Sequence, residues 1–196
     1  MSRIYVVRHG EASWHEEDYD QLTDKGHAQA RAVGAELAAR GIRPDVVVSG
    51  TLRRHRETAA GLLEGAGWDH AVAEDDRWNE LDYGAWDGVP NASVTPEQWA
   101  AWRADATFAP PGGETLVALA ARVHEACDEL AARAERRDIV VVTHVSPIKA
   151  AFGWALGVGI EVSWRCFVAP ASIMRIVVGR TGTSLRSFNE IAHLER

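Results

Sequence analysis

The sequence predicts an α/β fold: a three-layer sandwich with a mostly parallel central sheet, helices on both faces and an antiparallel hairpin near the carboxyl end. Apolar runs rich in β-branched residues, at 3–7, 45–48 and 139–142, are typical of buried strands. A polar turn and then a helical pattern follow each run, as in parallel sheets covered by their connecting helices. Because 196 residues suffice for one domain with a sizeable core, we expect a single domain over 1–196.

Capping residues and glycines delimit the helices that follow these strands. A polar loop at 12–21 leads to a helix that Thr23 caps and Gly41 ends. Helical patterns at 52–60 and 146–157 come directly after the second and third strands. In each case a strand therefore delivers its last residues to the entry of a helix.

The remaining elements are a short helix, a long helix and a hairpin. Residues 95–98 read Thr-Pro-Glu-Gln, which combines an N-cap, a proline at the first helical position and a glutamine at the third. The apolar face of 114–136 predicts the longest helix. Two strand-like runs, 173–178 and 184–191, flank a glycine-containing turn and predict the hairpin.

The regular pattern is interrupted at 68–111, which is rich in aromatic and acidic residues. We interpret this segment as a lid or insertion over the active site at the sheet edge. The alternative is that its rings pack a small satellite core, which is the safer interpretation for at least two of them. The aromatic side chains concerned are Trp78, Trp86, Trp99, Trp102 and Phe108.

Composition limits the partners and the compartment. The formal net charge of −7 argues against general binding to nucleic acid or to an anionic membrane. No apolar run approaches the roughly 18 residues of a membrane span, and the first strand starts too early to leave room for a signal peptide. Cys127 and Cys166 match no metal or redox spacing, so we expect small buried side chains and a cytoplasmic protein.

Charged and imidazole side chains gather at three predicted strand ends. Arg8 and His9 end the first strand, His144 ends the third, and Arg54 lies in the first helical turn after the second. Ligands bind at the carboxyl ends of strands in open α/β sheets, so these side chains would converge on one pocket, with Glu80 supplied by the segment at 68–111. An ordinary turn with a solvated arginine and a structural histidine is the alternative for Arg8 and His9 alone.

This combination of side chains suits phosphoryl transfer. Two guanidiniums bind phosphate oxygens, one imidazole attacks phosphorus, and the other, protonated, adds a donor. A carboxylic acid in an aromatic-lined segment, here Glu80, is expected to have a raised pKa and to serve as general acid and base. We expect no metal ion and no cofactor, since the cationic donors suffice and the P-loop and magnesium-binding patterns are missing. His15 and the carboxylates around it match no metal-site spacing and favour a solvated acidic loop.

Six stretches, in order along the chain, resemble the histidine phosphatase superfamily, in the branch of the cofactor-dependent phosphoglycerate mutases and their phosphatase relatives. The first reads Val-Arg-His-Gly-Glu, and the others are similar to the family's Leu-Thr-x-x-Gly, Ser-x-x-Leu-x-Arg-x-x-x-Thr-Ala, Glu-x-x-x-Gly-x-Trp-Asp-Gly, Gly-Gly-Glu-Thr and Val-Thr-His stretches. They lie at 7–11, 22–26, 49–59, 80–88, 112–115 and 142–144. The resemblance implies a phosphoglycerate mutase-like fold, His9 as nucleophile, Glu80 as proton donor, and Arg8, Arg54 and His144 as phosphate ligands, with His144 also counted as catalytic.

The chain departs from the family pattern at two places. His15 stands where many members carry a phosphate-contacting asparagine, and Val145 and Ser146 follow His144 where relatives often have two glycines. The acid-phosphatase branch takes its proton donor from an aspartate after the second histidine, which this chain lacks. Glu80 is therefore the expected acid, and Glu11 is the rival candidate.

We expect a metal-independent phosphatase that hydrolyses a small-molecule phosphomonoester. The aromatic side chains in 68–111 favour an apolar or aromatic leaving group. A phosphoglycerate mutase is the first alternative, but the short stretch at 88–112 lacks the longer insertion of those enzymes, and a short lid favours hydrolysis. A catalytically silent phospholigand-binding module is the second alternative, against which stand the nucleophile His9 and the acid Glu80.

Overall fold

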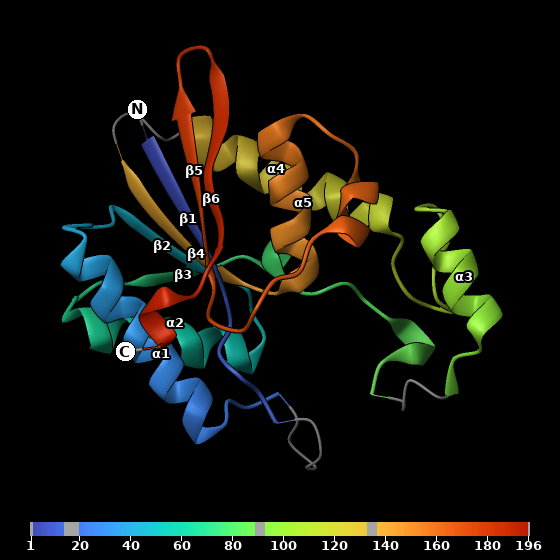
Figure 1. Cartoon of the computed structure of the whole chain (residues 1–196), viewed down its shortest axis with the longest axis horizontal. Coiled ribbons are helices and arrows are strands. Elements are labelled where there is room, and N and C mark those ends of the chain that lie inside the picture. Colours follow the sequence, from blue (N-terminus) through green and yellow to red (C-terminus); the bar gives the residue numbers. More distant parts are fainter. Residues whose placement is uncertain (1, 14–19, 89–92, 133–136, 196) are drawn as a thin grey trace.

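The computed structural model describes residues 2–13, 20–88, 93–132 and 137–195, and it confirms the predicted fold class. Six strands form one sheet in the order β3-β2-β4-β1-β5-β6 (Figure 1). The first four in the chain are mutually parallel, and the last two form the antiparallel hairpin. The strands are β1 (Ser2–Arg8), β2 (Val46–Ser49), β3 (Val72–Glu74), β4 (Asp138–Thr143), β5 (Ile173–Gly179) and β6 (Gly182–Glu190).

Helices cover both faces of this sheet. Figure 1 shows α1 and α2 on one side and α4 and α5 on the other. Alternation along β1 explains the two cores: Ile4 and Val6 pack toward α4 and α5, whereas Tyr5 and Val7 pack toward α1 and α2. The helices are α1 (Asp24–Ala39), α2 (Arg53–Ala66), α3 (Pro96–Ala104), α4 (Leu116–Ala132) and α5 (Val145–Leu156), with 3-10 turns η1 (Asp76–Trp78), η2 (Gly84–Trp86), η4 (Ile160–Arg165) and η5 (Ala192–Leu194).

The strand order brings the predicted site residues to one edge. β4 lies between β1 and β2, with Arg8 in register with Thr143 and Ser49 in register with Val142. All three strands are parallel, so their carboxyl ends meet at the same edge of the sheet. The residues that follow β1, β2 and β4 are therefore neighbours.

The predicted helix caps are present. The hydroxyl of Thr23 accepts a hydrogen bond from the backbone N–H of Gly26 at 3.1 Å and begins α1. Thr95 and Gln98 form the capping box of α3. Helix α5 ends at Gly157 in the left-handed conformation, as predicted.

Close backbone contact explains two glycines near the site. A Cβ atom at Gly26 would lie 2.0 Å from the carbonyl oxygen of Glu11, and one at Gly10 would lie 2.4 Å from the carbonyl oxygen of Gly26. Only glycine permits this approach of the start of α1 to the loop after β1. The contact fixes the loop that carries His9.

Segment 68–111 differs in part from its prediction. Val72–Glu74 forms the edge strand β3, which its brevity concealed in the sequence. Trp78 and Trp102 are buried, and Trp86 packs against neighbouring rings, so these rings pack inward as the alternative interpretation held, but into the main core on the α4 and α5 side of the sheet and not into a satellite core. The covering of the active site by this segment stays a prediction.

The predictions for the cysteines and for the helix ends are confirmed in part. Cys127 is buried as expected, whereas Cys166 is only partly buried. Helix α2 extends beyond the predicted range to Ala66, and the last predicted turn of the helix at 114–136 lies outside the described residues. Within the part of the chain that the structure describes, no helix is both long enough and apolar enough to span a membrane.

Candidate active site

The carboxyl end of β1 places His9 in a buried position with one free ring nitrogen. Its side chain is nearly inaccessible, and Nδ1 lies 2.6 Å from the carbonyl oxygen of Gly10. Because a carbonyl oxygen only accepts hydrogen bonds, Nδ1 carries the hydrogen and Nε2 keeps its lone pair. Nε2 has no hydrogen-bond partner among the described residues. The ring of His9 thus presents an unpartnered, unprotonated nitrogen.

The surroundings keep this imidazole uncharged. Burial lowers the pKa of His9 well below its usual value, and the nearby imidazoles and guanidiniums lower it further. A neutral imidazole has the lone pair that nucleophilic attack requires.

Two guanidiniums belong to the same site. Nη1 of Arg8 donates to the carbonyl oxygen of Val168 at 2.7 Å, and Nη1 of Arg54 donates to the carboxylate of Asp20. The Nε atoms of both arginines are buried without a partner in the described structure. Burial lowers the pKa of Arg8, which nevertheless stays charged because guanidinium titrates far above neutrality. Two cationic side chains with unpaired Nε donors in the described structure therefore lie close enough to act electrostatically on His9, an arrangement that suits an oxyanion.

The end of β4 adds His144 and, through it, Glu80. The ring of His144 lies 4.5 Å from that of His9 between centroids, and its Nδ1 contacts Oε2 of Glu80. Thr143 donates from its hydroxyl to the carbonyl oxygen of Trp78 at 2.5 Å, which holds the segment before Glu80 against β4. The structure therefore brings together all five residues predicted for the site: Arg8, His9, Arg54, Glu80 and His144.

The raised pKa that the sequence predicts for Glu80 is wrong. Burial of the carboxyl group raises its pKa, but the adjacent His144 and hydrogen bonds from Ser146 and Leu81 outweigh burial and lower it to about 2. The aromatic side chains that motivated the expectation pack against one another, while Glu80 contacts hydrogen-bond donors. The low pKa makes Glu80 an ionised carboxylate near neutral pH.

The protonation of His144 follows from opposing influences. Burial lowers its pKa, and the carboxylate of Glu80 raises it. A protonated His144 agrees with an ionised Glu80, whereas burial favours the neutral ring. The N–H of Leu81 donates to Oε1 of Glu80 at 2.7 Å and so helps to stabilise the ionised carboxyl group. For His144, burial outweighs the carboxylate and lowers the pKa, so the structure disfavours the protonated His144 expected from the sequence.

Arg122 of α4 hydrogen-bonds to the backbone around Glu80, and the sequence analysis did not identify it. Its guanidinium donates to the carbonyl oxygens of Arg77, Asn79 and Glu80 at 2.7, 2.9 and 3.1 Å. Both oxygens of Glu114 accept from Arg122 at 2.8 Å, which explains the glutamate in the Gly-Gly-Glu-Thr stretch. Only the fold brings Arg122 to these carbonyls, so no local pattern identifies it.

A third histidine, also missed, completes a cluster of imidazoles. His55 is fully buried, and its ring lies 5.9 Å from that of His9 and 6.1 Å from that of His144. Neither ring nitrogen has a partner among the described residues. A Cβ at Gly50 would lie 2.2 Å from Nδ1 of His55, so the glycine after β2 makes room for this ring.

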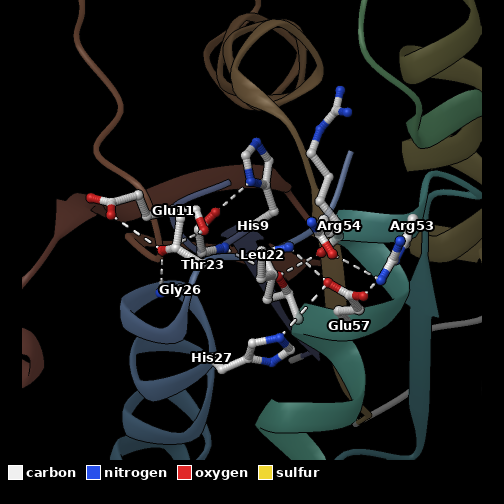
Figure 2. Close-up of polar contacts among 12 residues, drawn as sticks. His9, Glu11, Leu22, Thr23, Gly26, His27, Arg53, Arg54 and Glu57 are labelled. Carbon is white, nitrogen blue, oxygen red and sulfur yellow. Dashed lines mark hydrogen bonds and ion pairs between the residues drawn. The ribbon is translucent and has the colours of Figure 1, made fainter. Parts of the chain in front are cut away.

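Glu11, the rival acid, lies outside the pocket. Its carboxylate accepts from Nζ of Lys25 at 2.8 Å and from the hydroxyl of Thr23 at 3.2 Å. Figure 2 shows it beside Thr23 and Gly26, at the start of α1. The hydrogen bond from Lys25 lowers the pKa of this exposed carboxyl group, which suits an acid poorly. His15 lies outside the described residues.

Two cavities differ in their relation to the site. One of about 510 Å³, lined by β2, η1 and α4 side chains, includes none of the five pocket residues. Another of about 460 Å³ is lined by Glu80, Arg122 and their neighbours. We identify the site by its convergent charged and imidazole groups, because a shallow oxyanion pocket needs donors more than volume. Among the described residues, no three histidine, cysteine, aspartate or glutamate side chains are grouped to hold a metal ion.

The buried histidines predict that the protein loses stability as pH falls below about 6.5. The pKa values of His9, His55 and His144 are all lowered in the folded state, mainly by burial. The unfolded chain therefore binds protons that the folded chain does not, and stability rises with pH up to about 6.5. The slope is at most about 1.4 kcal/mol per pH unit for each histidine.

Urea unfolding between about pH 5 and 7 measures this slope. We expect His55→Phe, which keeps a ring but removes one titration, to reduce the slope. An equal slope in this variant, with two-state unfolding intact, would contradict the assignment of a neutral buried His55.

The fold and site together define an α/β protein that gathers two guanidiniums, three imidazoles and one carboxylate near the carboxyl edge of its sheet. Residues 4–191 match the family model described as the histidine phosphatase superfamily (branch 1). The chain belongs to the histidine phosphatase superfamily, as the resemblance implied.

Similar proteins include both phosphatases and mutases. The bifunctional protein Rv2228c of Mycobacterium tuberculosis is 31% identical over 203 residues, which cover 98% of this chain and 55% of that protein. A 2,3-bisphosphoglycerate-dependent phosphoglycerate mutase of Mesorhizobium japonicum is 36% identical over 137 residues, covering 63% of this chain and 66% of the mutase. The mycobacterial glucosyl-3-phosphoglycerate phosphatase Rv2419c, solved with inorganic phosphate, has a TM-score of 0.82 and 31% identity, covering 97% and 98% of the two chains. The chain spans about half, 55%, of the length of the first curated relatives that it matches.

Proposed function

We propose that this chain is a metal-independent phosphomonoester hydrolase that works through a phosphohistidine on Nε2 of His9. The observation that carries the proposal is the buried, unpartnered Nε2 of a neutral His9 beside the unpaired Nε atoms of two guanidiniums. A nucleophile and cationic donors for the same phosphoryl group then stand in one pocket.

In the first step, Nε2 of His9 forms a bond to phosphorus and the bond to the leaving oxygen breaks. Arg8 and Arg54 hold the phosphoryl oxygens, and His144, which takes a proton from solvent when the bound anion raises its pKa, donates a further hydrogen bond. The leaving oxygen takes a proton from Glu80. In the second step, water attacks phosphorus, Glu80 accepts the water's proton, and inorganic phosphate leaves as His9 returns to neutral.

Glu80 must gain a proton before it can act as acid. The pKa of Glu80 is low in the structure. A bound phosphate places negative charge beside the carboxylate and therefore raises this pKa. A phosphomonoester monoanion also carries one proton into the site, since its second pKa is about 6. The substrate thus supplies both the charge and the proton that convert Glu80 to an acid.

One observation that favours hydrolysis over mutase chemistry is the structural similarity to the phosphatase Rv2419c over nearly the whole of both chains. The stretch at 88–112 is also short. A mutase must retain the phosphoryl group while excluding water, which a short cover does poorly.

We also propose that segment 68–111 covers the leaving group of the substrate. Exposed Phe167, adjacent to the Val168 carbonyl that binds Arg8, offers an apolar surface near the phosphate site. Because Trp78 and Trp102 are buried, the preference for apolar or aromatic leaving groups rests on the other rings.

The test compares two activities of the same preparation. We expect inorganic phosphate release from p-nitrophenyl phosphate and from a panel of phosphomonoesters, with negligible isomerisation of 3-phosphoglycerate. Robust isomerisation with negligible phosphate release would overturn the hydrolase assignment in favour of the mutase.

A further inference from the structure

We propose that Asp20 is a positioning residue for the phosphate-binding guanidinium of Arg54. The proposal rests on the proposed function only in taking Arg54 as a phosphate ligand. The sequence analysis treated Asp20 as part of a solvated acidic loop, and the structure places it elsewhere: its carboxylate accepts from Nη1 of Arg54.

The carboxylate of Asp20 has a second partner that fixes its place. Oδ2 accepts from the backbone N–H of Arg53, the first residue of α2, at 2.8 Å. The N-cap of α2, Leu52, has no side-chain hydrogen bond to the helix, so Asp20 supplies an acceptor there from a distant part of the chain. One carboxylate therefore joins the start of α2 to the guanidinium of the next residue.

The segment that carries Asp20 is itself anchored to α2. Glu57 accepts from the backbone N–H of Leu22 and from Nε of Arg53, both at 2.7 Å. Nη2 of Arg53 also donates to Oε1 of Gln21 at 3.1 Å. Figure 2 shows Glu57 between Leu22, Arg53 and His27. These hydrogen bonds hold the segment that carries Asp20 against the start of α2.

The contact with Asp20 uses one side of the Arg54 guanidinium and leaves the side that carries Nε for a ligand. Nη1 is occupied by Asp20, while Nε is buried and has no partner among the described residues. The hydroxyl of Thr58 donates to the carbonyl oxygen of Arg54 at 2.7 Å and accepts from the N–H of Gly10 at 3.1 Å, which ties the same helical turn to the loop carrying His9. Holding a flexible arginine in one orientation before the ligand arrives strengthens binding.

The experiment measures inorganic phosphate binding by calorimetry and kcat/KM with p-nitrophenyl phosphate. We expect Asp20→Ala to weaken phosphate binding and lower kcat/KM by about 10-fold or more, as removal of supporting partners does elsewhere. Asp20→Asn, which keeps one acceptor oxygen, should recover part of the loss. Glu74→Gln is the matched control: it removes a carboxylate from Arg56 of the same helix and leaves Arg53 and Arg54 untouched.

A double-mutant cycle separates positioning from general destabilisation. In an Arg54→Ala background, Asp20→Ala should change phosphate affinity by less than about 2-fold, because its target is absent. An equal loss in both backgrounds, or tighter phosphate binding in the Asp20→Ala variant of the otherwise unchanged chain, would overturn the proposal. Phosphate affinity does not depend on which phosphoryl reaction occurs, so failure of the hydrolase assignment alone would leave this cycle unaffected.

Discussion

Replacing His9 by alanine is expected to lower phosphatase turnover by about 10⁴-fold or more, because the proposed covalent route then has no nucleophile. The structure leaves Nε2 as the free nitrogen, with Nδ1 directed at the carbonyl oxygen of Gly10. The other two histidines of the cluster are held differently. Neither ring nitrogen of His55 has a partner among the described residues, and Nδ1 of His144 contacts the carboxylate of Glu80. The measurement is steady-state release of p-nitrophenol and of inorganic phosphate.

His70→Ala serves as the control for this experiment. Nδ1 of His70 likewise lies close to the carbonyl oxygen of the following residue, Ala71, at 2.8 Å, but His70 lies outside the pocket. Its replacement should leave turnover within about 2-fold of the parent, as expected for a site away from the chemistry. Turnover in His9→Ala above about one tenth of the parent value would contradict the nucleophile assignment.

Replacing Glu80 by glutamine is expected to slow the reaction by about 10²- to 10⁴-fold for alkyl phosphates, whose leaving oxygen needs a proton. The first step with p-nitrophenyl phosphate should be much less affected, since p-nitrophenolate leaves without one. The second step still lacks a base to activate water. We therefore expect a burst of p-nitrophenol followed by slow turnover, measured by stopped-flow absorbance.

Glu11→Gln is the matched control for Glu80→Gln. Glu11 is the other carboxylate close in sequence to the nucleophile, but Lys25 and Thr23 hold it at the start of α1. Its replacement should leave the dependence on leaving group unchanged. Equal losses in the rate of the first step for alkyl and p-nitrophenyl phosphates in Glu80→Gln would argue that Glu80 acts by supporting His144 and not as the acid.

The elements with strong local signals could be predicted from the sequence. The β-branched runs of β1, β2 and β4 identify buried parallel strands, and Thr23 and Thr95 identify two helix starts. Their order implies a shared edge, and so the convergence of site residues that lie far apart in the chain. The short edge strand β3 has too few residues to show a pattern.

The supporting contacts could not be predicted, because they depend on which segments meet. Asp20 belongs to an acidic loop by composition, and only folding places it on Arg54. Arg122 has no local sign of its bonds to the carbonyl oxygens around Glu80. The direction of the pKa shift of Glu80 could not be predicted for the same reason: only the fold brings His144 and the hydroxyl of Ser146 to its carboxyl group.

The central claim is a phosphoryl group carried by His9. The most direct test mixes the protein with p-nitrophenyl phosphate, quenches it in alkaline denaturant, which preserves the acid-labile nitrogen–phosphorus bond, and locates the modification by mass spectrometry. Glu80→Gln is the best form for this test, since its second step should be slow and the intermediate should accumulate. We predict one phosphoryl group on His9 and none in His9→Ala. Substrate turnover with no phosphohistidine in either the parent or Glu80→Gln would contradict the account, and a phosphoryl group on His55 or His144 would assign the nucleophile elsewhere.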